Sequence, residues 1–388
     1  MEFATDRTLS TLQIGLHWFP ERAGGLDRVY YDLIRALPAA GVQCKGLVCG
    51  SENVLPDSSG AVRAFAKPGD SLLKRWVGVR RAMREELAAT DFDLVVSHFC
   101  LYTLPVRGII ASHQLPLVVH FQGPWAQESR QEGAGRAAVF AKHAIERQVY
   151  SRAARFIVLC DPFGDILESM YGIARDRIHR VPPGLDSARF RTDLSRAEAR
   201  QRLGWPADRH IIFTARRLAG RMGLEDLIDA ALKVRASTSD ILILIAGKGR
   251  LAETLQQRID AAGLSDHVRL LGFMPDADLP MAYAAADLCV VPTVALEGFG
   301  LVTIESLAAG TPVMVTPVGG LPDGVIGLAP QLVLPATGAA ALAEGISGAL
   351  SGRLPLPSRE QCREHAAANF DWKVIAARVR AVYEDALK

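Results

Sequence analysis

The sequence lacks a long apolar run. Nowhere do about 18 uncharged apolar residues follow one another, which is the minimum for a membrane-spanning helix. Residues 1–10 carry Glu2, Asp6 and Arg7 without an apolar stretch, so we expect no signal peptide. The six cysteines are widely spaced and none forms a Cys-x-x-Cys pair, which argues against a zinc site or a disulfide framework. We therefore expect a soluble, cytoplasmic protein with reduced thiols.

The sequence also lacks an excess of charge of one sign. Its 44 Lys and Arg against 42 Asp and Glu leave a net charge of +2, so we expect no nucleic-acid partner. Hydrophobic residues make up 49% and charged residues 22%, which excludes a disordered chain or a coiled coil. At about 150 residues per domain, 388 residues predict two or three domains.

Short apolar runs alternate with helical patterns along the whole chain, which predicts an α/β fold with parallel sheets. The predicted strands lie at 12–16, 44–48, 94–97, 117–121 and 156–159, then at 211–214, 241–246, 268–271, 288–291 and 312–316. A Pro-Pro-Gly sequence at 182–184 interrupts the pattern. We expect domains at 1–186 and 187–369, followed by an amphipathic helix within 370–388. Ligands of such folds bind beyond the carboxyl ends of the strands.

The densest chemistry lies at residues 296–305, Leu-Glu-Gly-Phe-Gly-Leu-Val-Thr-Ile-Glu. The segment follows a predicted strand and leads into a predicted helix. Its two glycines let the backbone approach a ligand closely, and the free N–H groups at the helix start form an anion site. Glu297 and Glu305 flank that site, where carboxylates suit the hydroxyl groups of a sugar. On spacing alone, a helix cap at Glu297 and a surface role for Glu305 fit equally well.

This Glu-x7-Glu pattern resembles the hallmark of the retaining glycosyltransferases of family 4. Other segments resemble that family in the same order along the chain: Pro20 with Gly24-Gly25, 181–190, 246–249, 311–320 and 370–372. The resemblance implies the GT-B fold, in which two Rossmann-like, doubly wound domains face each other across a cleft and the last helix crosses back to the first domain. It implies transfer of a sugar from a nucleotide-sugar, UDP-linked more often than GDP-linked, to an acceptor hydroxyl with retention of configuration.

The resemblance also assigns roles to individual residues. Glu305 would accept hydrogen bonds from the ribose hydroxyls, and Glu297 would orient the donor sugar. The backbone N–H groups of Gly300 and Leu301 would hold the diphosphate. The remaining residues implied in donor binding are Gly24, Gly25, Gly247, Lys248, Phe273, Met274, Phe299 and Val302.

Two positions depart from the family pattern. Family members place an Arg, and then a Lys before a Gly, near the leaving phosphate. Here Arg217 matches the Arg, but Met222 stands at the Lys position before Gly223, so we expect Arg221 to supply the second cation. The alternative is that these arginines lie on a solvated loop.

The second departure is Gln122, which stands where the family has a His near the reacting sugar carbon. Three interpretations remain. The Gln122 amide, both donor and acceptor, fills the role; His120, on the same face of the predicted strand, supplies it; or the enzyme is weak or inactive.

We expect no catalytic metal and no other cofactor. Two Asp-x-Asp strings, at 91–93 and 276–278, have the pattern by which transferases of another fold bind a divalent ion. Ordinary turns and caps explain both strings. The Gly-x-Gly at 247–249 follows the second predicted strand of its domain, whereas a dinucleotide-binding motif follows the first strand.

The expected partners are a nucleotide-sugar and a glycan, lipid-linked or small-molecule acceptor. Residues 72–84 mix basic and apolar residues at helical spacing, which is typical of a helix lying on the inner face of a membrane and equally of a solvated helix. Two other functions stay open: a non-catalytic sugar- or nucleotide-binding protein, and a nucleotide-sugar epimerase on the same fold. Release of a nucleoside diphosphate from the donor separates a transferase from a binding protein.

Overall fold

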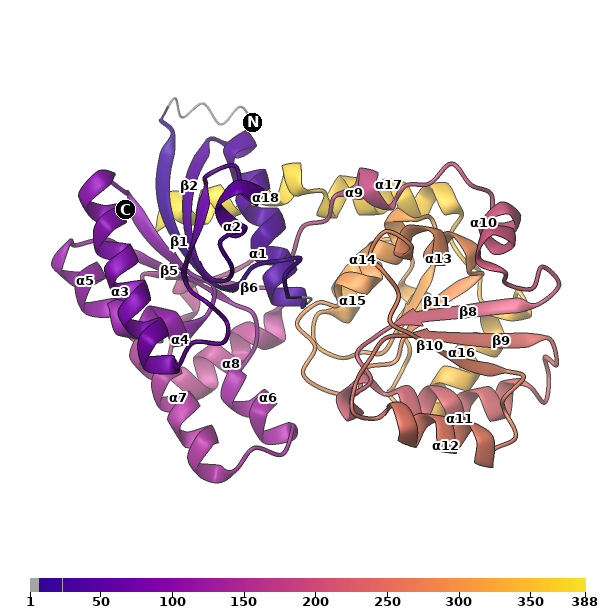
Figure 1. The fold of residues 1–388 in the computed structure, drawn as a ribbon. Helices are drawn as coiled ribbons and strands as arrows, with labels where there is room; N and C mark the ends of the chain where they lie inside the picture. The colour runs from indigo at the N-terminus through magenta and orange to yellow at the C-terminus, as the bar shows by residue number, and fades with distance from the viewer. Residues whose placement is uncertain (1–6, 23) are drawn as a thin grey trace. The chain divides into compact units, whose positions relative to one another are not determined.

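The computed structural model describes residues 7–22 and 24–388, which divide into two compact units. Unit 1 comprises Met1–Gly184 with Trp372–Lys388, and unit 2 comprises Leu185–Asp371. The chain changes unit within two residues of the limits derived from the sequence. Each unit is built on a parallel sheet, so the predicted fold class is confirmed (Figure 1). Within these described ranges, no helix has the length and apolar character needed to cross a membrane.

The sheet of unit 1 has seven strands in the order β3-β2-β1-β4-β5-β6-β7. The strands are β1 Leu9–His17, β2 Val42–Cys49, β3 Val62–Ala66, β4 Leu94–Ser97, β5 Leu117–Phe121, β6 Arg155–Val158 and β7 Ile178–Arg180. The helices are α1 Gly25–Ala36, α2 Val54–Asp57, α3 Leu72–Ala89, α4 Cys100–Thr103, α5 Arg107–Ser112, α6 Trp125–Gln131, α7 Arg136–Tyr150, α8 Asp161–Tyr171 and α18 Trp372–Asp385. Both β4 and β5 are wholly buried, as parallel strands covered on two faces are.

Helices cover both faces of this sheet. The larger apolar core joins the sheet to α3, α4, α5, α7 and α8. A smaller cluster around Trp18, Tyr30 and Ile34 packs under α1. The last helix, α18, contacts α1 and β6, so it belongs to unit 1 although the chain reaches it through unit 2. Ile375, Val379 and other buried residues form its inner side.

Unit 2 has five strands in the order β10-β9-β8-β11-β12. They are β8 His210–Ala215, β9 Ile241–Ala246, β10 Val268–Gly272, β11 Leu288–Val291 and β12 Val313–Val315. The helices are α9 Ser187–Phe190, α10 Arg196–Leu203, α11 Leu224–Val234, α12 Ala252–Ala261, α13 Leu279–Ala285, α14 Leu301–Ala308, α15 Leu321–Val325, α16 Ala339–Leu350 and α17 Arg359–Phe370. One face packs on α11, α12 and α16, and α14 packs with α13, α17 and α9.

The strand order creates a switch point in each unit. In unit 2, β8, β9 and β10 follow one another outward in one direction, whereas β11 and β12 extend in the other. The loops that leave β8 and β11 therefore diverge at the carboxyl edge of the sheet, where α/β folds bind ligands. In unit 1 the same divergence occurs between β1 and β4.

One side of α3 is exposed and mixed in character. Leu73 is 71% and Val77 58% exposed, and Lys74, Arg81 and Arg84 are exposed on the same helix. The opposite side, with Val79 and Met83, is buried in the core. The predicted amphipathic helix at 72–84 is thus present, with apolar as well as basic residues on its outer side.

Candidate functional site

A buried ion pair lies at the switch point of unit 2. Arg216 follows β8, Glu297 follows β11, and the Arg216 Nη2 atom forms a salt bridge with Glu297 Oε2. The Arg216 side chain is 7% and the Glu297 side chain 13% exposed. Thr293 Oγ1 accepts a hydrogen bond from the same Nη2 at 2.6 Å. The strand order therefore brings together two charges that are 81 residues apart in the sequence.

The pair keeps Glu297 ionised. Burial alone would raise the pKa of its carboxyl group, but the charges of Arg216 and Arg221, with hydrogen bonds from Arg216 and Thr293, lower the pKa below its usual value. An ionised carboxylate held in this way accepts hydrogen bonds well. It is poorly suited to act as a general acid.

Arg216 also lies next to position 222, where Met stands in place of the Lys of the family pattern. Met222 is buried in the core of unit 2, and its Sδ atom lies 3.0 Å from Arg216 Nη2. The cation next to the position where the family has a Lys is therefore Arg216. Arg221, which we expected there, instead donates from Nη1 to the carbonyl oxygen of Leu296 at 2.7 Å.

Arg221 holds a strained segment of backbone. Leu296 has a φ of 48°, in the left-handed region that residues other than glycine rarely adopt. Backbone of this kind persists where the surrounding structure enforces it, and it is concentrated at functional sites. Besides the hydrogen bond to Leu296, Arg221 accepts one from the Val294 N–H through its own carbonyl oxygen. Arg221 therefore fixes the loop that carries Glu297.

Two glycines allow other backbone segments to approach the backbone of Arg216 and Glu297 closely. Gly319 has a φ of 56°, and a Cβ atom there would lie 1.7 Å from the carbonyl oxygen of Glu297. Gly247 has a φ of 146°, and its Cβ atom would lie 1.8 Å from the carbonyl oxygen of Arg216. Any side chain at these positions would push apart the loops that present Arg216 and Glu297.

The predicted anion site lies at the start of α14. Gly300 precedes the helix with a φ of 73°, and Leu301 and Val302 form its first turn. Glu305 lies further along the helix, is 3% exposed, and accepts a hydrogen bond from the Tyr283 hydroxyl at 2.8 Å. It is therefore not the surface residue of the alternative interpretation. Phe299 is 2% exposed and its ring packs against Phe370, with ring centres 5.4 Å apart, so its side chain belongs to the core.

Three other predicted residues meet at the ends of β9 and β10. The Lys248 Nζ atom lies 5.2 Å from the centre of the Phe273 ring, and that ring is 58% exposed. Gly247 donates its N–H to the carbonyl oxygen of Gly272 at 2.7 Å, which ties the two strand ends together. Arg217 is exposed. Met274, next to Phe273, is half-buried.

The predicted residues of unit 1 lie at the carboxyl ends of its strands. Gly24 precedes α1 with extended backbone, and Gly25 begins that helix. Gln122 directly follows β5, and its Nε2 atom is buried without a hydrogen-bond partner. His120 is 6% exposed, and Tyr383 Oη lies 3.0 Å from its Nε2 atom. Burial lowers the pKa of His120 to about 3, so its ring is neutral at physiological pH.

Sequence reasoning missed Arg216, and one signal could have revealed it. Two arginines are adjacent in the sequence, and we assigned the role to Arg217 because it matched the family pattern. The first residue after a buried strand is the one closest to the switch point. Arg216, directly after β8, is therefore a further cation at this point, next to the predicted Arg217, whose role stays a prediction.

Comparison with known proteins decides the family. The family model "Glycosyl transferases group 1" matches residues 195–369, and "Glycosyltransferase Family 4" matches residues 23–189. A D-inositol 3-phosphate glycosyltransferase 1 of Catenulispora acidiphila is 31% identical over 312 residues, which cover 78% of this chain and 74% of that protein. The chain belongs to glycosyltransferase family 4.

Further relatives of this glycosyltransferase agree. A D-inositol 3-phosphate glycosyltransferase of Mycolicibacterium smegmatis is 34% identical over 304 residues, covering 76% of this chain and 68% of that protein. Sucrose-phosphate synthase of Thermosynechococcus elongatus has the same fold, with a TM-score of 0.78 at 22% identity over 97% of this chain and 98% of that one. Anabaena HepE in complex with UDP-glucose gives a TM-score of 0.78 at 18% identity, covering 97% and 100% of the two chains. The predicted GT-B fold and enzyme class are confirmed.

The contact between Arg216 and Met222 predicts that the two positions are coupled. Arg216→Ala leaves a buried carboxylate without its cation, so we expect the free energy of unfolding to fall by about 3–5 kcal/mol. Met222→Lys places a second positive charge beside Arg216 and should also destabilise the protein. In the double variant the new ammonium group takes over the cation's place near Glu297. Urea unfolding of the original chain, the two single variants and the double variant should therefore give a coupling energy between positions 216 and 222 of at least about 1 kcal/mol. Losses that simply add would show that the Arg216 guanidinium does not replace the missing Lys.

Proposed function

We propose that this glycosyltransferase takes its sugar from a UDP-linked donor and transfers it to an acceptor hydroxyl with retention of configuration and without a metal ion. The arrangement of Arg216, Glu297 and the start of α14 at one switch point carries the proposal. Support for UDP comes from a neighbour in fold, Anabaena HepE, whose structures contain UDP, UDP with glucose, and UDP-glucose.

The nucleotide end of the donor would lie over the ends of β9 and β10. The exposed ring of Phe273 offers a face on which a base can stack. The buried carboxylate of Glu305 would accept hydrogen bonds from the ribose hydroxyls. Because Tyr283 donates to Glu305 Oε2, the orientation of that carboxylate is set before a ligand binds.

The diphosphate would lie at the start of α14. The N–H groups of Gly300 and Leu301 precede or begin the helix, where unpaired donors and the helix dipole attract anions. Arg216 and Arg221 add fixed positive charge within the same group of loops. Charges that are already in position stabilise the leaving diphosphate at little reorganisation cost, which is why we propose no metal ion. In the described part of the chain, no three His, Cys, Asp or Glu side chains cluster as metal ligands.

The transfer itself needs no carboxylate nucleophile. Glu297 is held by Arg216 and Thr293, so in this scheme it accepts hydrogen bonds from hydroxyls of the donor sugar and orients the ring. The acceptor oxygen then bonds to the anomeric carbon on the face from which the diphosphate departs. The C–O bond to the phosphate breaks with its electron pair, and the acceptor proton passes to the leaving phosphate oxygen. Attack on that face retains the configuration.

Release of UDP tests the proposal directly. UDP-sugars incubated with the full chain should yield UDP slowly by hydrolysis and faster when an acceptor is present, and EDTA should leave both rates unchanged. Arg217→Ala, which removes an exposed cation of the same loop, should lower the rate because the leaving group loses charge stabilisation. A coupled assay for UDP measures each rate. No release from any common UDP-sugar would contradict the proposal, and loss of activity in EDTA would contradict its metal-independent form.

Glu305 provides a second test. Glu305→Ala removes charge-assisted hydrogen bonds to the ribose, so we expect UDP affinity to fall by about 1.5–3 kcal/mol in isothermal titration. Tyr283→Phe keeps the carboxylate but removes the hydrogen bond at 2.8 Å that orients it, so it should weaken UDP binding less than Glu305→Ala does. If both variants lose stability but bind UDP as the original chain does, the role of Glu305 is structural.

We also propose that the exposed side of α3 makes a peripheral contact with anionic membranes. Exposed Leu73 and Val77 beside basic residues have the character of helices that lie in the interface. The full chain should therefore sediment with phosphatidylserine-rich vesicles but not with phosphatidylcholine vesicles. The double variant Leu73→Ser, Val77→Ser should lose this binding, whereas Phe140→Ala, which removes an exposed ring elsewhere in unit 1, should keep it. Equal sedimentation of all three chains would contradict the proposal.

A further inference from the structure

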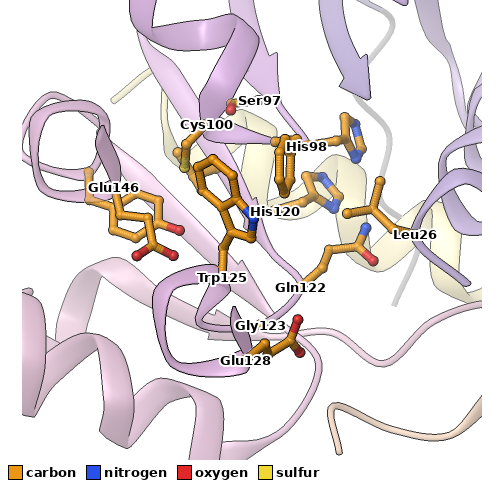
Figure 2. A pocket seen from close by; sticks show the side chains of 13 residues that line it. Leu26, Ser97, His98, Cys100, His120, Gln122, Gly123, Trp125, Glu128 and Glu146 are labelled. Atoms are coloured by element: carbon orange, nitrogen blue, oxygen red, sulfur yellow. The ribbon is translucent and has the colours of Figure 1, made fainter. Parts of the chain in front are cut away.

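Unit 1 contains a pocket that extends from His120 and Gln122, the residues predicted to lie near the reacting sugar carbon, to side chains that have no predicted role. It lies at the carboxyl ends of β4 and β5, and its lining comes from those strand ends, α1, α4, α6 and α7. Figure 2 shows Trp125 near its centre, with Glu146 on one side and His120 and Gln122 on the other. Every lining residue belongs to unit 1.

The first polar atom that lacks a partner is His98 Nδ1. His98 Nε2 lies 2.8 Å from Gln13 Oε1, and the Gln13 amide nitrogen donates to Thr11 Oγ1 at 2.9 Å. Because Gln13 Oε1 only accepts, His98 Nε2 carries the hydrogen. Burial and the neighbouring His120 lower the pKa of His98, so the ring is neutral. Nδ1 is therefore a buried hydrogen-bond acceptor.

Two more polar atoms of the lining lack partners. Gln122 Nε2 is a donor. Glu146 Oε1 accepts when the carboxyl group is ionised and can donate when it is protonated, because burial raises the pKa of that group to about 7. Glu146 is wholly buried, and its other oxygen accepts a hydrogen bond from the Tyr171 hydroxyl at 2.8 Å. Buried polar groups of folded proteins are nearly always paired. A donor, an acceptor and a carboxyl oxygen that can play either role match a ligand with several hydroxyl groups, since each hydroxyl both donates and accepts.

The rest of the lining suits a flat, uncharged ring. Trp125 packs edge-on against Phe99, with ring centres 5.0 Å apart, and aromatic walls with a few polar groups are typical of small-molecule pockets. The thirteen lining residues in the described chain include the carboxyl groups of Glu128 and Glu146 but neither Lys nor Arg. Lys142 lies 5.0 Å from the Trp125 ring centre, but it hydrogen-bonds to Ser129 and is outside the lining.

We propose that this pocket binds an uncharged, hydroxyl-bearing ring of the acceptor and rejects its phosphorylated counterpart, an inference that rests on the glycosyl transfer proposed above. Hydroxyl groups of such a ring would complete the hydrogen bonds of His98, Gln122 and Glu146. A phosphate group would meet carboxyl groups and neutral rings, where nothing offsets the loss of its hydration. The acceptor would thus differ from the one in the name of a similar protein, the D-inositol 3-phosphate glycosyltransferase 1 of Catenulispora acidiphila.

Matched ligand pairs test the inference on the full chain saturated with UDP. The pairs are myo-inositol with D-inositol 3-phosphate, and methyl α-glucoside with glucose 6-phosphate, titrated by saturation-transfer NMR. We expect the neutral member of each pair to bind at least about fivefold more tightly. Tighter binding of a phosphorylated member, or no detectable binding of either neutral ligand, would overturn the proposal.

Two variants locate the binding. Gln122→Glu replaces the unpartnered donor with an acceptor of the same size and should weaken the neutral ligands about 3- to 10-fold. Trp125→Leu removes the flat wall and should weaken them as well. Phe140→Ala, a 74% exposed ring on α7 outside the pocket, is the control and should change nothing. Gln122→Glu should leave UDP affinity unchanged, and unchanged neutral-ligand affinity in that variant would overturn the proposal.

Measurements of UDP release and UDP binding on the same proteins show whether the pocket assignment or the proposed function fails. A chain that releases UDP from its donor but prefers phosphorylated rings would overturn the pocket assignment alone. A chain that does not bind UDP would overturn the proposed function. If Gln122→Glu weakens UDP-glucose relative to UDP as strongly as it weakens the neutral ligands, the pocket holds the donor sugar and the acceptor assignment is wrong.

Discussion

The buried ion pair between Arg216 and Glu297 is the interaction on which the organisation of unit 2 depends. Either charge alone would be costly to bury, so the loops after β8 and β11 must be held at one separation. Gly247 and Gly319 permit the close backbone contacts that this requires, and Arg221 fixes the strained Leu296. The pair lies beside the start of α14, so the same constraint places fixed charges next to a group of free N–H donors.

The two units use one architecture for different chemistry. At the switch point of unit 2 the sequence places charges, which suits a diphosphate. Beside the corresponding edge of unit 1 it places two histidines whose pKa values are lowered by burial, an amide and two carboxyl groups, with no Lys or Arg among the lining residues of the described pocket. Tyr383 of α18 reaches His120, so the last helix contributes to the pocket's support as well as to the core. The strand order fixes where each site forms, and the loop residues decide what it can bind.

Much of the fold was predictable because buried parallel strands are continuous apolar runs. The limits of β4, β5, β9 and β11 agree with the sequence prediction, whereas β3 and β7 at the sheet edges were missed because their burial alternates or is partial. Residues 187–203 form two helices, α9 and α10, because Ser195 and Glu198 form a capping box that begins α10. The pairing of Arg216 with Glu297 was not predictable from spacing, because it depends on strand order.

A crystal structure of the full chain with UDP would show whether the start of α14 holds the diphosphate. We expect diphosphate oxygens about 3 Å from the N–H groups of Gly300 and Leu301 and near the Arg216 guanidinium, with the uracil on Phe273. The Arg216–Glu297 pair should remain intact in that complex. UDP bound elsewhere, with the start of α14 unoccupied, would contradict the account.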